Sequence, residues 1–219
     1  MSQDLLPQEL ASRMKEENLR QALFYAWILE RVPLIPRFFS QDRPAKILDL
    51  GSKNFVYAAA LAKFLNEIYE NFYLTGLEID PHRVYRDFYT RGDYAQYYAA
   101  LASSFYSNSA VRFQEGDWLD EKFNQNYDLI TCFFPFLYED LHSKFGLLPQ
   151  SFSPEAFYRK AITQAAQILF FHQGQQEYTD SLELLQKLGG GEIVFSENFF
   201  ANPWMKRKYP VYVLLWRKN

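Results

Sequence analysis

Apolar residues gather in short runs that alternate with longer helical patterns along most of the chain. The clearest case lies at residues 46–55, where an apolar run ends at Gly51. A short run of this kind predicts a buried parallel strand. Residues 56–65 then carry alanines and leucines at helical spacing, so this stretch predicts a strand, a glycine turn and a helix. Such a unit places its turn beside a ligand at the carboxyl edge of a sheet, with Asp49 and Gly51 nearest to that ligand.

Six further segments have the pattern of strands, and helical patterns separate most of them. They are residues 73–79, 111–115, 127–133, 167–171, 192–196 and 209–217. The segment 127–133 is largely apolar, which favours a central strand. No helical pattern separates the last two segments, so we expect an antiparallel edge there. The sequence therefore predicts an α/β fold with an open, mostly parallel seven-stranded sheet, helices on both faces and an antiparallel last strand.

The N-terminal part of the chain has a different pattern. Residues 4–31 predict one or two amphipathic helices, which Pro33 and Pro36 end. We therefore expect a helical extension over residues 1–40 and a single α/β domain over residues 41–219. The extension either packs on the sheet or covers its carboxyl edge, and the sequence favours neither arrangement.

Composition narrows the classes of partner. The chain has 219 residues, of which 48% are hydrophobic, and this length suits one well-buried domain. A net charge of −3 argues against a polyanion-binding surface, so nucleic acid is not an expected partner. The one basic cluster, residues 205–208, is either a solvated strand edge or a local phosphate or RNA contact, and the first reading is the commoner one.

Cysteine and histidine usage bears on the compartment and on metals. The single cysteine excludes an internal disulfide and fits a reducing compartment. The three histidines lie far apart in the sequence without metal-ligand spacing, so no metal is expected. The chain shows neither a secretory signal nor an apolar run of bilayer length, which predicts a cytoplasmic protein without a membrane partner.

Candidate site residues fall at the predicted carboxyl ends of three strands. Asp49 and Gly51 end the first, Glu78 ends the second, and Asp117 with Trp118 follows the third. Ligands of open α/β sheets bind outside these ends, where the strand order reverses. A carboxylate at the end of the second strand can accept the hydroxyls of a ribose, so Glu78 is the expected ribose partner. The alternative role for this acid is at a helix N-terminus, where Asp80 already stands.

These residues form an ordered series of motifs. They are Ile47-Leu-Asp-Leu-Gly51, Gly76-Leu-Glu-Ile-Asp80, Glu115-Gly-Asp-Trp118 and Tyr127-Asp-Leu-Ile-Thr-Cys-Phe-Phe-Pro-Phe136. In this order the series resembles class I (Rossmann-like) S-adenosylmethionine-dependent methyltransferases over residues 45–217. The resemblance implies S-adenosylmethionine as cofactor, with its methionine part along Asp49 and Gly51, its ribose on Glu78, its adenine amino group at Asp117 and its adenine beside Trp118. The cofactor-binding residues expected in this way are Asp49, Gly51, Ser52, Lys53, Glu78, Ile79, Asp117, Trp118 and Phe133.

The chain departs from the family at the glycine-rich turn. Only Gly51 remains there, and Lys53 and Phe55 stand at the positions of the later glycines. Glycine lets the backbone approach a ligand closely, and these bulky residues work against that approach. Lys53 either pairs with the carboxylate of the cofactor or is a solvated loop lysine. The long spacing from Asp49 to Glu78 disfavours NAD binding.

The segment after the fourth strand is the expected acceptor side, where Phe133 to Phe136 would line the reacting methyl group. Phe134-Pro135-Phe136 resembles the loop of amino-methyltransferases, without the polar residue that precedes it in that family. The catalytic candidates are Phe134, Pro135 and Tyr138. An oxygen nucleophile needs a base, for which Tyr138, Glu139 and His142 are nearest in sequence.

The expected activity is methyl transfer to an unidentified small-molecule or protein acceptor. The alternative is a non-catalytic scaffold with the same fold, whose pocket is filled by Phe55 or Lys53.

Aromatic residues crowd residues 85–106, within a helical pattern from His82 to Phe105 that is broken near Gly92 and Asp93. This segment is either a lid or partner surface that exposes Tyr94, Tyr97 and Tyr98, or an ordinary helix whose aromatic side chains face the core.

Overall fold

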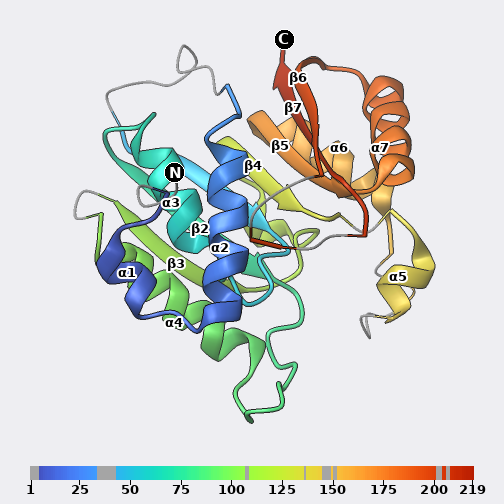
Figure 1. Cartoon of the computed structure of the whole chain (residues 1–219). Coiled ribbons are helices and arrows are strands. Elements are labelled where there is room, and N and C mark those ends of the chain that lie inside the picture. The colour runs from blue at the N-terminus through green and yellow to red at the C-terminus, as the bar shows by residue number, and fades with distance from the viewer. Residues whose placement is uncertain are drawn as a thin grey trace.

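A computed structural model describes residues 5–33, 43–106, 109–135, 137–144, 149, 152–200, 204–205 and 208–219. Its centre is a seven-stranded sheet with the order β3-β2-β1-β4-β5-β7-β6 (Figure 1). The strands are β1 (Ala45–Leu50), β2 (Phe72–Glu78), β3 (Ala110–Glu115), β4 (Tyr127–Phe133), β5 (Ala165–Gln173), β6 (Gly191–Phe199) and β7 (Val211–Lys218).

Strand directions confirm the predicted architecture. The neighbouring strands from β3 to β5 pair in parallel, whereas β7 is antiparallel to both β5 and β6. The apolar strand β4 occupies the middle of the sheet, as its sequence predicts. The chain order reverses between β1 and β4, so the carboxyl ends of these two strands mark the point where α/β sheets bind ligands.

Helices cover both faces of the sheet. They are α1 (Gln8–Ser12), α2 (Glu16–Leu29), α3 (Ala58–Asn66), α4 (Arg91–Ser103), α5 (Glu139–Lys144), α6 (Pro154–Gln164) and α7 (Gln175–Leu188). Helices α1 to α4 share one apolar core, while α6 and α7 belong to a second core across the sheet (Figure 1). Strand β1 serves both cores because Ile47 points into the first and Leu48 into the second.

The N-terminal helices belong to the first core. Helix α2 packs against α3, and the ring of Tyr25 on α2 lies 5.0 Å from that of Tyr57 and 4.9 Å from that of Phe133. Phe133 is the last residue of β4. Of the two arrangements that the sequence left open, the structure therefore shows the extension packed on a face of the sheet.

The predicted helix from His82 is wrong over its first nine residues. Residues 82–90 form a hairpin, in which Val84 bridges Thr90, and this hairpin projects below α4 (Figure 1). Helix α4 begins at Arg91 because Thr90 and Asp93 form a capping box that satisfies the first helical N–H groups. Gly92 and Asp93 accordingly lie in the first turn of the helix and do not interrupt it.

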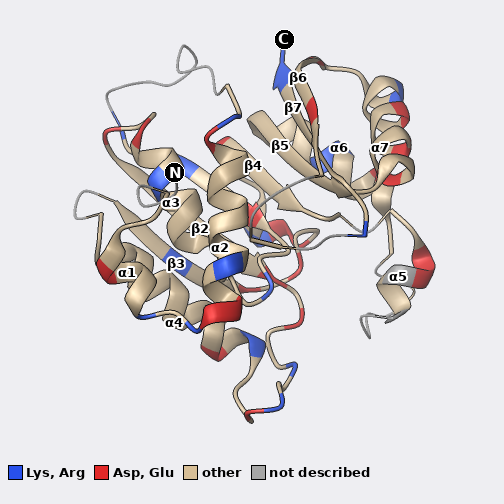
Figure 2. Cartoon of the chain, in the orientation of Figure 1, with Lys and Arg blue, Asp and Glu red and all other residues tan. Residues whose placement is uncertain are grey.

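The fold has several smaller features. The segment predicted as a loop after β4 contains the short helix α5. Within the described residues, no helix combines the length and the apolar character that crossing a bilayer requires. Lys, Arg, Asp and Glu residues are distributed over many elements of the described chain (Figure 2). Lys206 and Arg207 of the basic cluster lie outside the described residues.

Candidate functional site

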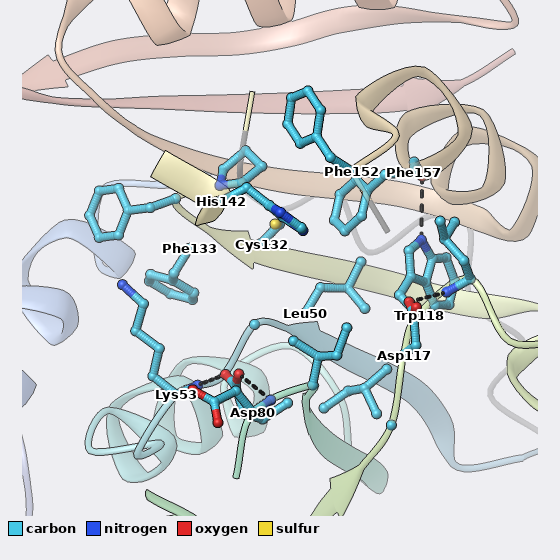
Figure 3. Close-up of a pocket in the computed structure, with 18 of the residues that line it drawn as sticks. Leu50, Lys53, Asp80, Asp117, Trp118, Cys132, Phe133, His142, Phe152 and Phe157 are labelled. Atoms are coloured by element: carbon cyan, nitrogen blue, oxygen red, sulfur yellow. Dashed lines mark hydrogen bonds between the residues drawn. The ribbon is translucent and has the colours of Figure 1, made fainter. Parts of the chain in front are cut away.

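A cavity of about 930 Å³, counting its open mouth, lies at the carboxyl ends of β1, β2 and β4 (Figure 3). It occupies the carboxyl edge of the sheet, where the sequence predicts the ligand, next to the point at which the strand order reverses. Of the residues expected at a cofactor site, those lining it are Gly51, Lys53, Glu78, Ile79, Asp117, Trp118 and Phe133. Phe134 and Pro135, expected on the acceptor side, line it as well.

The turn after β1 contains three residues with left-handed backbone conformation, of which only one is glycine. Gly51 has φ 68°, and Lys53 and Phe55 have φ 53° and 51°. Left-handed φ values favour glycine, and a larger residue adopts them at a cost of about 1–2 kcal/mol. The three left-handed positions are those at which the resembling family has glycine. Lys53 and Phe55 therefore occupy backbone conformations that favour glycine.

The two substituted side chains go to different places. Phe55 is fully buried in the first core, with its ring against Gly76 of β2, and does not line the cavity. Lys53 lines the cavity, and its Nζ lies 5.5 Å from the centroid of the Phe134 ring. Figure 3 shows Lys53 reaching into the cavity on the side of Phe133. Burial lowers the pKa of Lys53, and the charge of Glu78 opposes that shift.

Glu78 is held from three sides at the end of β2. Its Oε2 accepts a hydrogen bond from the backbone N–H of Lys53 at 2.8 Å. Its Oε1 accepts from the backbone N–H of Asp80 at 3.0 Å and from Nη1 of Arg91 at 3.1 Å. The residue is 4% exposed and borders the cavity, so its carboxylate is fixed at the place predicted for a ribose partner.

Asp49 and Ser52 were predicted to contact the ligand, but the structure places neither in the cavity wall. Both are fully buried. Asp49 accepts hydrogen bonds from the hydroxyls of Tyr57 at 2.8 Å and Thr131 at 2.6 Å. Side chains alternate along a strand, and it is Leu50 that faces the cavity. Burial raises the pKa of Asp49 to about 7, although both hydroxyls counter the shift.

The segment after β3 forms the opposite wall. The Asp117 carboxylate accepts a hydrogen bond from the backbone N–H of Leu119 at 2.9 Å. Trp118 is 5% exposed, and its indole N–H donates to the carbonyl oxygen of Phe157 at 3.3 Å. Trp118 and Phe157 lie on the side of the cavity away from Lys53 (Figure 3). Together they present flat apolar surfaces that suit a planar ring.

The acceptor side differs in part from the prediction. Phe133 stacks on Phe171 with ring centroids 4.0 Å apart, and Phe134 has φ 64°. Phe136 lies outside the described residues. Tyr138 does not line the cavity, because its hydroxyl donates to Asp180 on α7.

His142 of α5 does line the cavity, where burial lowers its pKa and so favours the neutral imidazole. The sequence named His142 only as one of three neighbouring bases. It gave no sign of the other lining residues Asp80, Arg91, Cys132, Phe152 and Phe157. Arg91 is brought there by the hairpin at residues 82–90, and Phe152 and Phe157 by the start of α6, whereas Asp80 and Cys132 lie at the ends of β2 and β4.

A lid built from Tyr94, Tyr97 and Tyr98 is not what the structure shows, since none of them lines the cavity. Tyr98 is 4% exposed, and its hydroxyl accepts a hydrogen bond from the amide of Asn18 on α2. The hydroxyl of Tyr94 accepts from Lys15 at 3.0 Å. These tyrosines therefore join α4 to the N-terminal helices.

Neither the scan against protein families nor the search of curated proteins finds a match. Solved methyltransferases share the fold at low sequence identity. The precorrin-6y C5,15-methyltransferase of Geobacter metallireducens superposes with a TM-score of 0.54 and 12% identity, over 89% of this chain and 87% of that one. The magnesium protoporphyrin IX methyltransferase of Synechocystis, with bound S-adenosylhomocysteine, gives 0.53 and 13% over 92% and 84%. The human methyltransferase 10 domain containing protein gives 0.51 and 12% over 93% and 83%. The chain thus has the fold of the class I S-adenosylmethionine-dependent methyltransferases.

Proposed function

We propose that this protein binds S-adenosylmethionine in the cavity and transfers its methyl group to a small-molecule or protein acceptor. The observation that carries the proposal is the fixed carboxylate of Glu78 in that cavity. The same cavity holds the left-handed turn at Gly51 and the flat surface of Trp118. The fold supports this assignment and, at 12–13% identity, leaves the acceptor open.

The residues present fit this cofactor. A carboxylate oxygen has two lone pairs, and Oε2 of Glu78 accepts one hydrogen bond within the described structure, so it can take a ribose hydroxyl as well. Trp118 and Phe157 offer a slot for adenine, and the Asp117 carboxylate can accept from its amino group.

The methionine end of the cofactor calls for a different contact. The backbone N–H groups of Gly51 and Ser52 both donate to the carbonyl oxygen of Leu77, and that of Lys53 donates to Glu78. These donors are engaged inside the protein. A carboxylate at this end is better matched by the ammonium of Lys53, which stands where the family has glycine.

Bound S-adenosylmethionine supplies an electrophilic methyl group on a positively charged sulfur. The aromatic faces of Phe133 and Phe134 favour a cation, and the walls of the cavity align the acceptor with the methyl group. An amine acceptor that arrives neutral needs only this positioning. For an acceptor that must lose a proton, the neutral imidazole of His142 is the base that the cavity offers.

Partner class follows from charge. The net charge is −3, and Lys and Arg residues are distributed over many elements of the described chain (Figure 2), so we do not propose a nucleic acid acceptor. The single buried cysteine fits a reducing compartment, and we propose the cytoplasm.

Calorimetric titration with S-adenosylmethionine and S-adenosylhomocysteine tests the proposal. Glu78→Gln and Asp117→Asn should each weaken binding about tenfold, because each removes a charged acceptor. Glu115→Gln is the matched control, since its side chain is 57% exposed and does not line the cavity. No heat of binding at millimolar ligand would remove the proposal and leave the scaffold role. Binding that all three variants retain would place the ligand elsewhere.

A further inference from the structure

Arg91 is a buried cation in the cavity wall that no sequence motif singles out. It is the first residue of α4, and the hairpin at residues 82–90 returns it to the end of β2. Its backbone N–H donates to the carbonyl oxygen of Arg83 at 2.8 Å, which fixes the base of the hairpin. Its side chain is 6% exposed.

Arg91 joins two carboxylates. Its Nη1 lies 3.1 Å from Oε1 of Glu78 and 3.4 Å from Oδ2 of Asp80. All three residues line the cavity. The side chain of Asp80 is 29% exposed, so its carboxylate is the more open of the two.

Stability alone gives a poor reason for this arrangement. The Nε–H of Arg91 is buried without a hydrogen-bond partner among the described residues. A buried donor left unpaired costs about 1–3 kcal/mol, and a buried ion pair often adds little net stability. What the arrangement does provide is a fixed orientation for both carboxylates.

That orientation limits what Glu78 can accept. Oε1 already receives two hydrogen bonds, from Asp80 and Arg91, which fill its two lone pairs. Oε2 receives one, from Lys53, and has room for one more. Glu78 can therefore take one hydroxyl of a ribose, and the second hydroxyl needs another acceptor.

We propose that Glu78 and Asp80 divide the two ribose hydroxyls of the ligand between them, and that Arg91 is the positioning residue that enforces this division. The proposal rests on the proposed function, because the ligand is taken to be an adenosine derivative. It differs from a single carboxylate that binds both hydroxyls. In this arrangement Asp80 binds the ligand directly, and the hairpin at residues 82–90 brings Arg91 to Asp80.

The test compares S-adenosylhomocysteine with its 2′-deoxy and 3′-deoxy analogues by calorimetry. On the wild-type chain each analogue should bind about tenfold more weakly, since each loses one hydrogen bond to a charged group. Asp80→Asn should reduce the penalty for one of the two hydroxyls, and Glu78→Gln should reduce the penalty for the other. Arg91→Met should lower the affinity for S-adenosylhomocysteine about tenfold. In this variant each deoxy analogue should bind less than about threefold more weakly than S-adenosylhomocysteine. Arg91→Lys should recover part of the lost affinity.

Arg86→Met is the matched control for Arg91, because Arg86 is an exposed arginine of the same hairpin that does not line the cavity. It should bind all three ligands as the wild type does. The inference is overturned if Asp80→Asn keeps both wild-type penalties, or if a folded Arg91→Met chain does. If Arg91→Met does not fold, the analogue titrations of Asp80→Asn alone test the inference, because Asp80 is partly exposed and its substitution is better tolerated. A wild-type chain that does not bind S-adenosylhomocysteine fails the proposed function itself, which is a separate result.

Discussion

The ring of Phe55 lies so close to Gly76 that a Cβ atom at Gly76 would stand 2.7 Å from Cε1 of the ring. Phe55 occupies a left-handed turn position at which the resembling family has glycine, and Gly76 lies opposite it in β2. The absence of a side chain at Gly76 on the neighbouring strand thus leaves room for the large ring of Phe55. This pairing explains how the turn accommodates the large side chain of Phe55.

Gly76→Ala should lower the free energy of unfolding by about 1–3 kcal/mol, because the fully buried ring has little room to move. Urea unfolding of the single variant measures the loss. In a double-mutant cycle, Phe55→Leu should recover part of it by shortening the side chain. Strictly additive effects of the two substitutions would show that the contact does not constrain Gly76.

A second consequence concerns the backbone at Lys53, which has φ 53°. Lys53→Gly and Lys53→Ala remove the same side-chain contacts, so their difference reports mainly on the backbone. Glycine adopts this φ freely and alanine does not, and Lys53→Gly should be more stable than Lys53→Ala by about 1 kcal/mol. Chemical unfolding of the two variants provides the comparison. Equal stability would mean that the turn relaxes away from the left-handed conformation once lysine is gone.

The strands were readable from the sequence because their signal is local. Strand β4 spans the residues predicted for it, since most of its residues are apolar and all of them are buried. The hairpin at residues 82–90 was misread because Tyr85, Phe88 and Tyr89 have helical spacing. A local signal did exist at Thr90 and Asp93, whose capping box marks the true start of α4.

The residues of the cavity wall that could be predicted are likewise those with a local signal in the sequence. Gly51, Glu78 and Asp117 were predictable because each directly follows or ends a strand at the carboxyl edge. Asp49 was misplaced because the side-chain alternation of its strand turns it away from the cavity. Arg91 reaches Glu78 only through the tertiary path of a hairpin, which no spacing in the sequence announces.

His172 of β5 is fully buried, and neither of its ring nitrogens has a hydrogen-bond partner among the described residues. Its ring stacks near Phe170, with centroids 5.8 Å apart. The unpaired N–H of a neutral imidazole costs about 1–3 kcal/mol when buried. His172→Phe removes that donor and keeps a flat ring, so we expect the variant to be about 1 kcal/mol more stable than the wild type at pH 7.

The advantage of His172→Phe should grow on acidification. Burial lowers the pKa of His172 from 6.5 to about 3, so between these values the unfolded chain binds a proton that the folded chain does not. The stability associated with His172 is therefore complete above pH 6.5 and is lost as the pH falls, by up to about 1.4 kcal/mol per unit. Asp49 has the opposite effect on the pH dependence of stability. Its pKa is raised to about 7, so its contribution to the free energy of unfolding is lost as the pH rises through that value. The wild type and the His172→Phe variant both contain Asp49, so the difference between their free energies of unfolding reports on His172 alone. Urea unfolding at pH 7, 6 and 5 should show a widening gap in favour of the variant, and a gap that stays constant would mean that His172 accepts a proton in the folded protein.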